Sequence, residues 1–127
     1  MKSLKIAICD DDSLQTSIIE TLIEEIALKK FIKIDISVFY DGITLKDYYK
    51  SHNNFDIIYL DIEMDKMNGI KTAQYIREIN PDVIIIFISG YENYFMQLFE
   101  VEPFRFIKKP IDSQKFNDIF CKARSEE

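Results

Sequence analysis

Acidic side chains follow two apolar segments of this chain, and their type and spacing favour the chemistry of a bound cation. The apolar run at residues 4–9 leads directly into three aspartates at positions 10–12, and the run at 55–60 leads into Asp61. Carboxylates held close together repel one another and raise their pKa values unless a cation joins them. Oxygen ligands of this kind suit a hard divalent ion such as Mg²⁺. If the two runs lie side by side, the sequence therefore predicts a metal site.

Two later segments end in side chains that could contact phosphoryl oxygens. The apolar run at 83–88 is followed by Ser89, and a short strand predicted at 104–107 is followed by a lysine pair ending in Lys109 and then by Pro110. A hydroxyl and an ammonium group can both donate hydrogen bonds to a phosphoryl group. One of the aspartates could then act as the nucleophile and form an aspartyl-phosphate. This set of groups is chemically consistent with phosphorylation of an aspartate.

These groups can meet only if the strands that carry them share one sheet. Strand-like runs alternate with helix-like segments along the whole chain, at residues 4–9, 34–38, 55–60, 83–88 and 104–107. Five such units predict an α/β fold, a doubly wound parallel sheet in the flavodoxin-like order 2-1-3-4-5. Ligands bind such sheets beyond the carboxyl ends of the strands, where the strand order reverses. That point lies between the first and third strands, which end in the acids.

Apolar periodicity and capping residues predict the helices. The first helix would begin at Asp12-Ser13 and bury a face of residues spaced four apart, namely Leu14, Ile18, Leu22 and Ile26. A helix rich in aromatic residues is predicted at residues 91–99, before the fifth strand. Asp12 fits the role of a helix cap as well as that of a metal ligand.

Composition limits the classes of function. With 127 residues, 47% of them hydrophobic, the chain is long enough for one domain with a core. No apolar run approaches the roughly 18 residues of a membrane span, and the acids at 10–12 argue against a signal peptide. Cys9 and Cys121 lack the spacing of a zinc site or a disulfide framework, which favours a reducing cytoplasm. A net charge of -6 disfavours direct binding of nucleic acid.

Four motifs, in order along the chain, resemble the signature of response-regulator receiver domains of the CheY-like superfamily. They are the residues 8–12, the segment 60–69 around Asp61, the pair Ser89-Gly90 and the pair Lys109-Pro110. The resemblance covers essentially the whole chain. Within it, the aromatic-rich stretch before Lys109 resembles the LytTR (LytR/AgrA-like) branch of the family.

The resemblance implies a phosphorylation site and its metal ligands. Asp61 would be the phosphoacceptor and would also contribute to the metal site. Asp11 would bind Mg²⁺ directly, with Asp10 helping, and the backbone carbonyl of Glu63 would complete the protein ligands. Asp65 stands where the family often has proline, which would loosen the loop after the acceptor and add negative charge near it.

The resemblance also implies the residues that respond to phosphorylation. Ser89 would donate a hydrogen bond to the phosphoryl group, and Lys109 would pair with it. The Lys109–Pro110 peptide bond would be cis. Phe106 would be the switch aromatic that changes rotamer with Ser89, and because it lacks a hydroxyl its switching would rest on packing alone.

The function implied is a phosphorylation-dependent switch rather than an enzyme with a separate substrate. A sensor histidine kinase would donate the phosphoryl group, and the face built from the fourth helix, the fifth strand and the fifth helix would change. That face would support a homodimer or control an effector domain, which in the LytTR branch is a C-terminal DNA-binding domain. Residues 1–127 would then be the receiver domain at the start of a longer, cytoplasmic transcription regulator without membrane contact.

Other readings of the same residues remain. A stand-alone receiver would need no effector domain. A haloacid-dehalogenase-type phosphatase would use Asp10 as nucleophile with Asp12 two positions on, but Leu14 stands where such enzymes have threonine or valine. No paired acid is predicted on a strand after Lys109, and no cap domain is predicted. A binding module that needs no phosphorylation would leave the set of acids, serine and lysine without a purpose.

Overall fold

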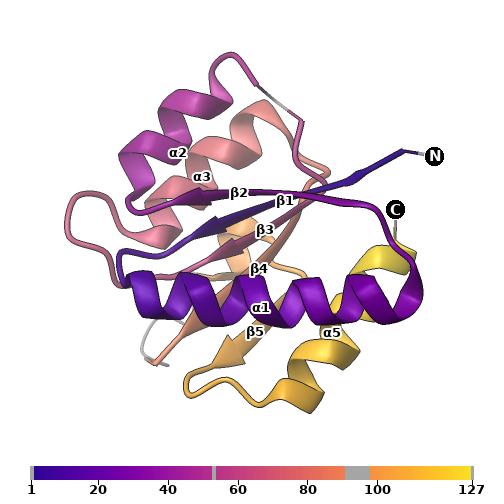
Figure 1. Ribbon diagram of the computed structural model, residues 1–127. Helices are drawn as coiled ribbons and strands as arrows, with labels where there is room; N and C mark the ends of the chain where they lie inside the picture. Colours follow the sequence, from indigo (N-terminus) through magenta and orange to yellow (C-terminus); the bar gives the residue numbers. More distant parts are fainter. Residues whose placement is uncertain (1, 53, 91–97, 127) are drawn as a thin grey trace.

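The computed structural model describes residues 2–52, 54–90 and 98–126, and these form a five-stranded parallel sheet with helices on both faces (Figure 1). The strand order is 2-1-3-4-5, so the predicted doubly wound α/β fold is confirmed. The helix predicted at residues 91–99 falls largely outside the described residues. Where the description resumes, a short 3-10 turn follows Leu98.

The element bounds agree with the predicted alternation to within a few residues. The strands are β1 (Leu4–Cys9), β2 (Ile34–Phe39), β3 (Ile57–Leu60), β4 (Ile84–Ser89) and β5 (Arg105–Lys108). The helices are α1 (Ser13–Lys30), α2 (Gly42–Tyr49), α3 (Gly69–Ile79), α5 (Ser113–Ser125) and the 3-10 helix η1 (Phe99–Val101).

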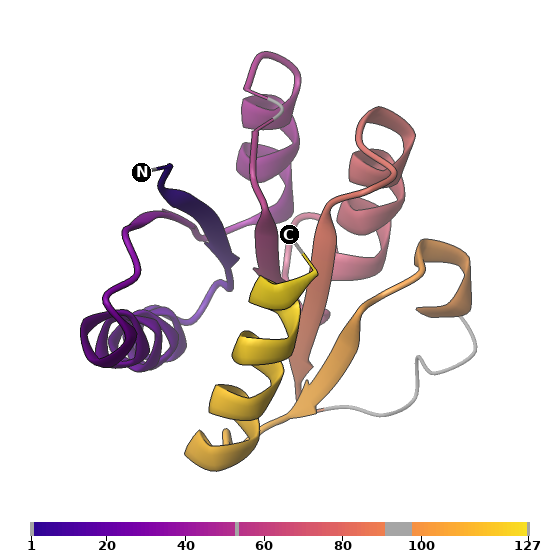
Figure 2. The same cartoon turned by 90° about the vertical axis from the view of Figure 1, so that its right-hand side faces the viewer.

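The sheet separates two apolar cores. Helices α1 and α5 cover one face, and α2, α3 and η1 cover the other; Figure 2 shows the two layers apart, with α1 at the lower left and α3 and η1 at the right. One core lies under α1 and α5 and contains Phe116 and Phe120, while the other lies under α2 and α3 and contains Leu45 and Ile76. Since β3 and β4 are buried on both faces, they read as the continuous apolar runs expected of central parallel strands.

The strand register brings the predicted site residues to one edge. In the β1–β3 pair Cys9 lies opposite Leu60, so the next residue on each strand is an aspartate, Asp10 and Asp61. The backbone N–H of Asp61 still donates to the Cys9 carbonyl at 2.9 Å. In the β4–β5 pair Ser89 lies opposite Lys108. The carboxyl edge of the sheet therefore collects all four strand ends.

The prediction of the buried face of α1 is wrong at its N-terminal end. Leu14 is 65% exposed and Ile18 37% exposed, and the residues that α1 buries are Thr16, Ile19, Ile23, Ile26 and Ala27. Four residues advance a helix by about 400°, so a strict four-residue spacing drifts by roughly 40° at each step. From Ile26 back to Leu14 that drift amounts to about a third of a turn, which carries Leu14 off the core. The alternation of three- and four-residue steps marks the true face.

Acidic and amide side chains cap the N-termini of helices that start at the carboxyl edge of the sheet. Asp12 Oδ1 accepts a hydrogen bond from the Leu14 backbone N–H at 2.9 Å, and Asn68 Oδ1 accepts one from the Lys71 N–H at 3.0 Å. Each bond satisfies one of the N–H groups that a helix start leaves open. Of the two roles open to Asp12, the structure shows the cap.

The buried Tyr59 hydroxyl leads to a prediction about stability. Tyr59 is 1% exposed on β3, its ring stacks on Phe116, and its hydroxyl has no hydrogen-bond partner among the described residues. Burying an unpaired hydroxyl is unfavourable, so Tyr59→Phe should keep or raise the free energy of unfolding, by up to about 1 kcal/mol. Urea unfolding measures this difference.

Tyr49 provides the matched control for this substitution. It is equally buried, but its hydroxyl accepts a hydrogen bond from Asn80 Nδ2 at 3.4 Å. Tyr49→Phe should therefore lower the free energy of unfolding by up to about 1 kcal/mol. A larger loss of unfolding free energy in Tyr59→Phe than in Tyr49→Phe would contradict the interpretation that the Tyr59 hydroxyl is buried without a partner among the described residues.

Candidate functional site

Three aspartates meet at the carboxyl edge of β1 and β3. Asp10, Asp11 and Asp61 each offer a carboxylate oxygen, and these oxygens all lie within 4.8 Å of one another. Asp10 is 1% exposed and Asp61 4% exposed, whereas Asp11 faces solvent. The three acids that were predicted to converge thus lie together, two of them buried and one exposed to solvent.

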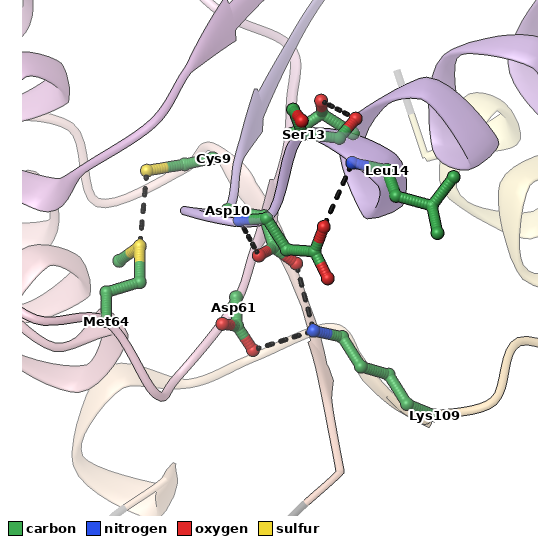
Figure 3. A network of polar contacts seen from close by, with 9 residues as sticks. Cys9, Asp10, Ser13, Leu14, Asp61, Met64 and Lys109 are labelled. Carbon is green, nitrogen blue, oxygen red and sulfur yellow. Dashed lines mark hydrogen bonds and ion pairs between the residues drawn. The ribbon is translucent and has the colours of Figure 1, made fainter.

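Lys109 places its ammonium group between the two buried acids (Figure 3). Its Nζ lies 3.0 Å from Asp10 Oδ2 and 3.5 Å from Asp61 Oδ1. The lysine follows β5, and its backbone N–H donates to the Ser89 carbonyl at 2.9 Å, which fixes where its side chain starts. The Lys109–Pro110 peptide bond is cis. Lys109 thereby supplies one positive charge to a pair of carboxylates.

One cation does not neutralise this cluster, and the pKa values of the two buried acids are raised. Burial, with the nearby charge of Asp10, raises the pKa of Asp61 to about 7 in spite of Lys109. Burial also raises the pKa of Asp10, although hydrogen bonds from the Asp12 backbone and from Lys109 oppose the change. Burial alone would lower the pKa of Lys109, but its bond to Asp10 and the charge of Asp61 raise it. The site keeps excess negative charge near neutral pH.

The donor set fits a magnesium ion. It consists of carboxylate oxygens only, which is the chemistry that hard divalent cations prefer, and it lies partly open at Asp11. Asp10, Asp11 and Asp61 would hold the ion. An ion bound there would supply the positive charge that the buried carboxylates lack and would help neutralise an incoming phosphoryl group.

The loop after Asp61 is held close to the acceptor by Gly69. A Cβ atom at Gly69 would lie 2.1 Å from the Asp61 carbonyl oxygen, so any other residue here would force the start of α3 or the acceptor loop to shift. The Gly69 N–H donates to the Ile62 carbonyl at 2.8 Å. On the other side of the loop, Met64 Sδ lies 3.8 Å from Cys9 Sγ. These contacts fix the backbone that carries the acceptor.

The remaining predicted residues lie near the same edge, and their roles stay predictions. Ser89 is fully buried at the end of β4. Phe106 is half-buried on β5 and packs against the core under α2 and α3. Glu63 is exposed in the loop two residues after Asp61.

Sequence reasoning missed Arg77, whose guanidinium group binds four backbone carbonyls at the far end of α3. No motif signals this role, because the acceptors are main-chain atoms and are the same for any sequence. In the sequence Arg77 is an ordinary charged residue of a helix end, next to Glu78, and nothing sets it apart.

Five parallel strands in this order, with acids and a lysine gathered at their carboxyl edge, define the class of the protein. The chain belongs to the response-regulator receiver domain family, whose model matches residues 6–120. Receiver domains are phosphoacceptor switches that bind Mg²⁺ in an acidic pocket and act in two-component systems.

Individual relatives support the finer branch. The chain is 37% identical to the sensory transduction protein LytT of Oceanobacillus iheyensis over 86 residues, which are 66% of this chain and 35% of that protein. It is 27% identical to the transcriptional regulatory protein YpdB of Escherichia coli K12 over 122 residues, 96% of this chain and 48% of YpdB. These relatives are consistent with the predicted LytTR branch.

A solved structure shows the same fold. The response regulatory domain of MrkE from Klebsiella pneumoniae superposes with a TM-score of 0.85 at 26% identity, covering 96% of each chain. The chain spans about a third to half of the length of the curated relatives named here. In the described part of the chain, no helix has an apolar stretch long enough to cross a bilayer.

Proposed function

We propose that this chain accepts a phosphoryl group on Asp61, with Mg²⁺ held by Asp10, Asp11, Asp61 and the Glu63 backbone carbonyl. The observation that carries the proposal is the meeting of three carboxylates within 4.8 Å of one another at the switch point of the sheet, with the Lys109 ammonium 3.0 Å from Asp10 and 3.5 Å from Asp61. A sensor histidine kinase is the proposed donor. Beyond self-phosphorylation from a donor and autodephosphorylation, we propose no enzymatic activity.

The transfer is a displacement at phosphorus. A carboxylate oxygen of Asp61 attacks, the P–N bond to the donor histidine breaks, and a P–O bond forms to give the mixed anhydride. The departing imidazole nitrogen takes up a proton. Lys109 already lies 3.5 Å from Asp61 Oδ1, so its ammonium can move onto a phosphoryl oxygen without a change of backbone.

The geometry favours Asp61 over Asp10 as the acceptor. Both oxygens of Asp10 accept hydrogen bonds, Oδ1 from the Asp12 N–H at 2.9 Å and Oδ2 from Lys109 Nζ at 3.0 Å. The Asp12 side chain caps α1, so it is not free to act as a general acid or base. A phosphatase that uses Asp10 as nucleophile and Asp12 as acid would have to break these bonds.

The switch residues complete the proposal. Ser89 and Lys109 would bind the phosphoryl oxygens, and Phe106 would follow Ser89 inward. Support comes from position: the Ser89 carbonyl is tied to the Lys109 N–H, and Phe106 is the second residue of β5, facing the core under α3. Movement of these groups would change the predicted face built from the fourth helix, β5 and α5, of which the structure describes β5 and α5.

Phosphorylation by a small phosphodonor tests the proposal. The protein is incubated with Mg²⁺ and the donor, and the base-labile, acid-stable phosphate is located by mass spectrometry in wild type, Asp61→Asn and Asp10→Asn. We expect label on Asp61 in wild type, none in Asp61→Asn, and slower labelling, still on Asp61, in Asp10→Asn because metal binding is weakened. EDTA should abolish labelling in wild type and in Asp10→Asn.

Label that persists in Asp61→Asn would sink the receiver mechanism, and label on Asp10 would favour the phosphatase mechanism. Sedimentation velocity of the same labelled sample tests the predicted homodimer through the face built from the fourth helix, β5 and α5. An unchanged sedimentation coefficient after full labelling would count against that dimer.

The relatives support a proposal about the partners of this chain. YpdB is named a transcriptional regulatory protein, and this chain matches only about half of it. We therefore propose that residues 1–127 work as the receiver domain of a longer regulator that controls transcription through a DNA-binding effector domain. A stand-alone receiver is the second candidate. A cytoplasmic location, without direct contact to nucleic acid or membrane, stays a prediction.

A further inference from the structure

Arg77 joins three parts of the chain through backbone carbonyls. Its Nε donates to the Val101 carbonyl at 2.7 Å and its Nη2 to the Glu102 carbonyl at 2.9 Å. Its Nη1 donates to the Val83 carbonyl and, at 3.3 Å, to that of Pro81. The guanidinium group thus connects the last turn of α3 to the start of β4 and to the end of η1, 24 and 25 residues later.

The turn that Arg77 holds has an unfavourable backbone conformation. Glu102 has a φ of 49°, in the left-handed region that residues other than glycine rarely adopt. Such a conformation persists only where surrounding contacts fix it. Two charge-assisted hydrogen bonds from one rigid guanidinium fork, to Val101 and Glu102, provide that restraint.

The other end of α3 is pressed against the acceptor. Gly69, its first residue, lies so close to the Asp61 carbonyl that a Cβ atom would overlap it, and its N–H is bonded to Ile62. Packed interiors do not absorb displacement in voids. A shift of the Asp61 backbone therefore has to move the start of α3, and a helix of 11 residues carries that shift to Arg77.

The segment held by Arg77 leads into the proposed switch. Two residues after Glu102, the N–H of Phe104 donates to the Ile85 carbonyl, and β5, which carries Phe106, begins at the next residue. Val101 and Ile76 belong to the same core cluster, and Phe106 packs against that cluster. The path from Asp61 to Phe106 through α3 is continuous in contacts.

We propose that Arg77 is a positioning residue that couples the acceptor loop to β5: it transmits the shift of α3 on phosphorylation of Asp61 to Val101 and Glu102, and from there to Phe106. The inference rests on the proposed phosphorylation of Asp61. It adds a second route to the switch, separate from the contact of Ser89 and Lys109 with the phosphoryl group. A purely structural Arg77 would stabilise the η1 turn and transmit nothing.

Backbone amide NMR separates these two roles. Uniformly ¹⁵N-labelled wild type, Arg77→Met, Arg77→Lys and Lys71→Met are compared with and without saturating Mg²⁺ and BeF₃⁻, a stand-in for the phosphoryl group. Lys71 is an exposed cation on the same helix and serves as the control. The reporters are the amides of Gly69 near the acceptor and of Val101, Glu102 and Phe106 beyond Arg77.

In wild type and Lys71→Met, BeF₃⁻ should shift all four amides. In Arg77→Met the Gly69 shift should keep its size, while the other three shrink by roughly twofold or more because the connection is cut. Arg77→Lys keeps the charge but not the fork, so its shifts should lie between. If Arg77→Met fails to fold, the reduced shifts in Arg77→Lys carry the same expectation.

Shifts of wild-type size at Val101 and Phe106 in Arg77→Met, or in Arg77→Lys where the methionine variant does not fold, would overturn the coupling role. Such a result would leave the proposed function intact, because the Gly69 shift reports binding at Asp61 on its own. A wild-type protein whose Gly69 amide ignores BeF₃⁻ would instead overturn the phosphorylation of Asp61 and the coupling together.

Discussion

Asp61→Asn is expected to raise the free energy of unfolding of the metal-free protein by on the order of 3 kcal/mol near neutral pH and above, and by little at acid pH. Burial raises the pKa of Asp61 to about 7 from the ordinary 3.8 of an aspartate. A raised pKa means that the folded state holds its proton more tightly than the unfolded state. Stability therefore falls as the pH rises between these two values and stays low above the higher one.

Asparagine has the shape of the protonated acid and never ionises. Its advantage should be small near the unfolded pKa of Asp61, grow through the pH window up to about 7, and then level off. Urea unfolding in EDTA at several pH values across that window measures the profile. Asp65→Asn removes an exposed carboxylate of the same loop and is the control, with an expected change within about 0.5 kcal/mol at every pH.

Mg²⁺ should reverse the order of stability of wild type and Asp61→Asn. An ion that binds only the folded state stabilises it in proportion to the logarithm of its concentration above the dissociation constant. Wild type offers three carboxylates to the ion and Asp61→Asn only two, so wild type should gain more stability from Mg²⁺. A gain in Asp61→Asn that is independent of pH, or an equal response of both proteins to Mg²⁺, would contradict the charge argument.

Gly69→Ala is expected to lower the free energy of unfolding by about 2–4 kcal/mol and to slow labelling of Asp61. The added Cβ would lie 2.1 Å from the Asp61 carbonyl oxygen, 2.9 Å from its carbonyl carbon and 3.0 Å from Ile62 Cα. All three atoms belong to the backbone, so no side chain can rotate away to make room. Relief requires that α3 or the acceptor loop move.

Gly90→Ala is the matched control, because a Cβ atom there meets no atom of the described residues within 4 Å. It should leave stability unchanged or raise it by up to about 1 kcal/mol through the unfolded chain. Urea unfolding and the rate of labelling with a small phosphodonor are measured for both variants. If Gly69→Ala were as stable as wild type, the acceptor loop would have space for a Cβ atom, and the steric argument from the Gly69 contacts would be wrong.

The position of the acids was predictable because topology alone determines it. Once five strand-like runs alternate with helices, the order of a doubly wound sheet follows, and the ends of β1 and β3 become neighbours. Asp10 and Asp61 then meet whatever the packing above and below the sheet. The same rule places Ser89 and Lys109 at that edge, since β4 and β5 run parallel to β1 and β3.

Features that depend on angles and main-chain atoms were not predictable. Leu14 was placed in the core because a four-residue spacing resembles a helical face, yet its drift leaves the side chain exposed. Phe55 was counted in the third strand for its apolar character; it is buried, but β3 starts only at Ile57. The contacts of Gly69 and Arg77 are made with backbone, so no pattern of side chains could indicate them.

The bond between Lys109 and Asp10 spans 99 positions of the sequence, and this has a consequence for how the protein is made. During synthesis Asp10 and Asp61 leave the ribosome long before the lysine that shares their charge. Contacts of such long range form late, because the loop that they close must first be ordered. We infer that the acidic edge closes only after β5 has been synthesised, so that a nascent chain stopped short of Lys109 holds two carboxylates it has no means to bury.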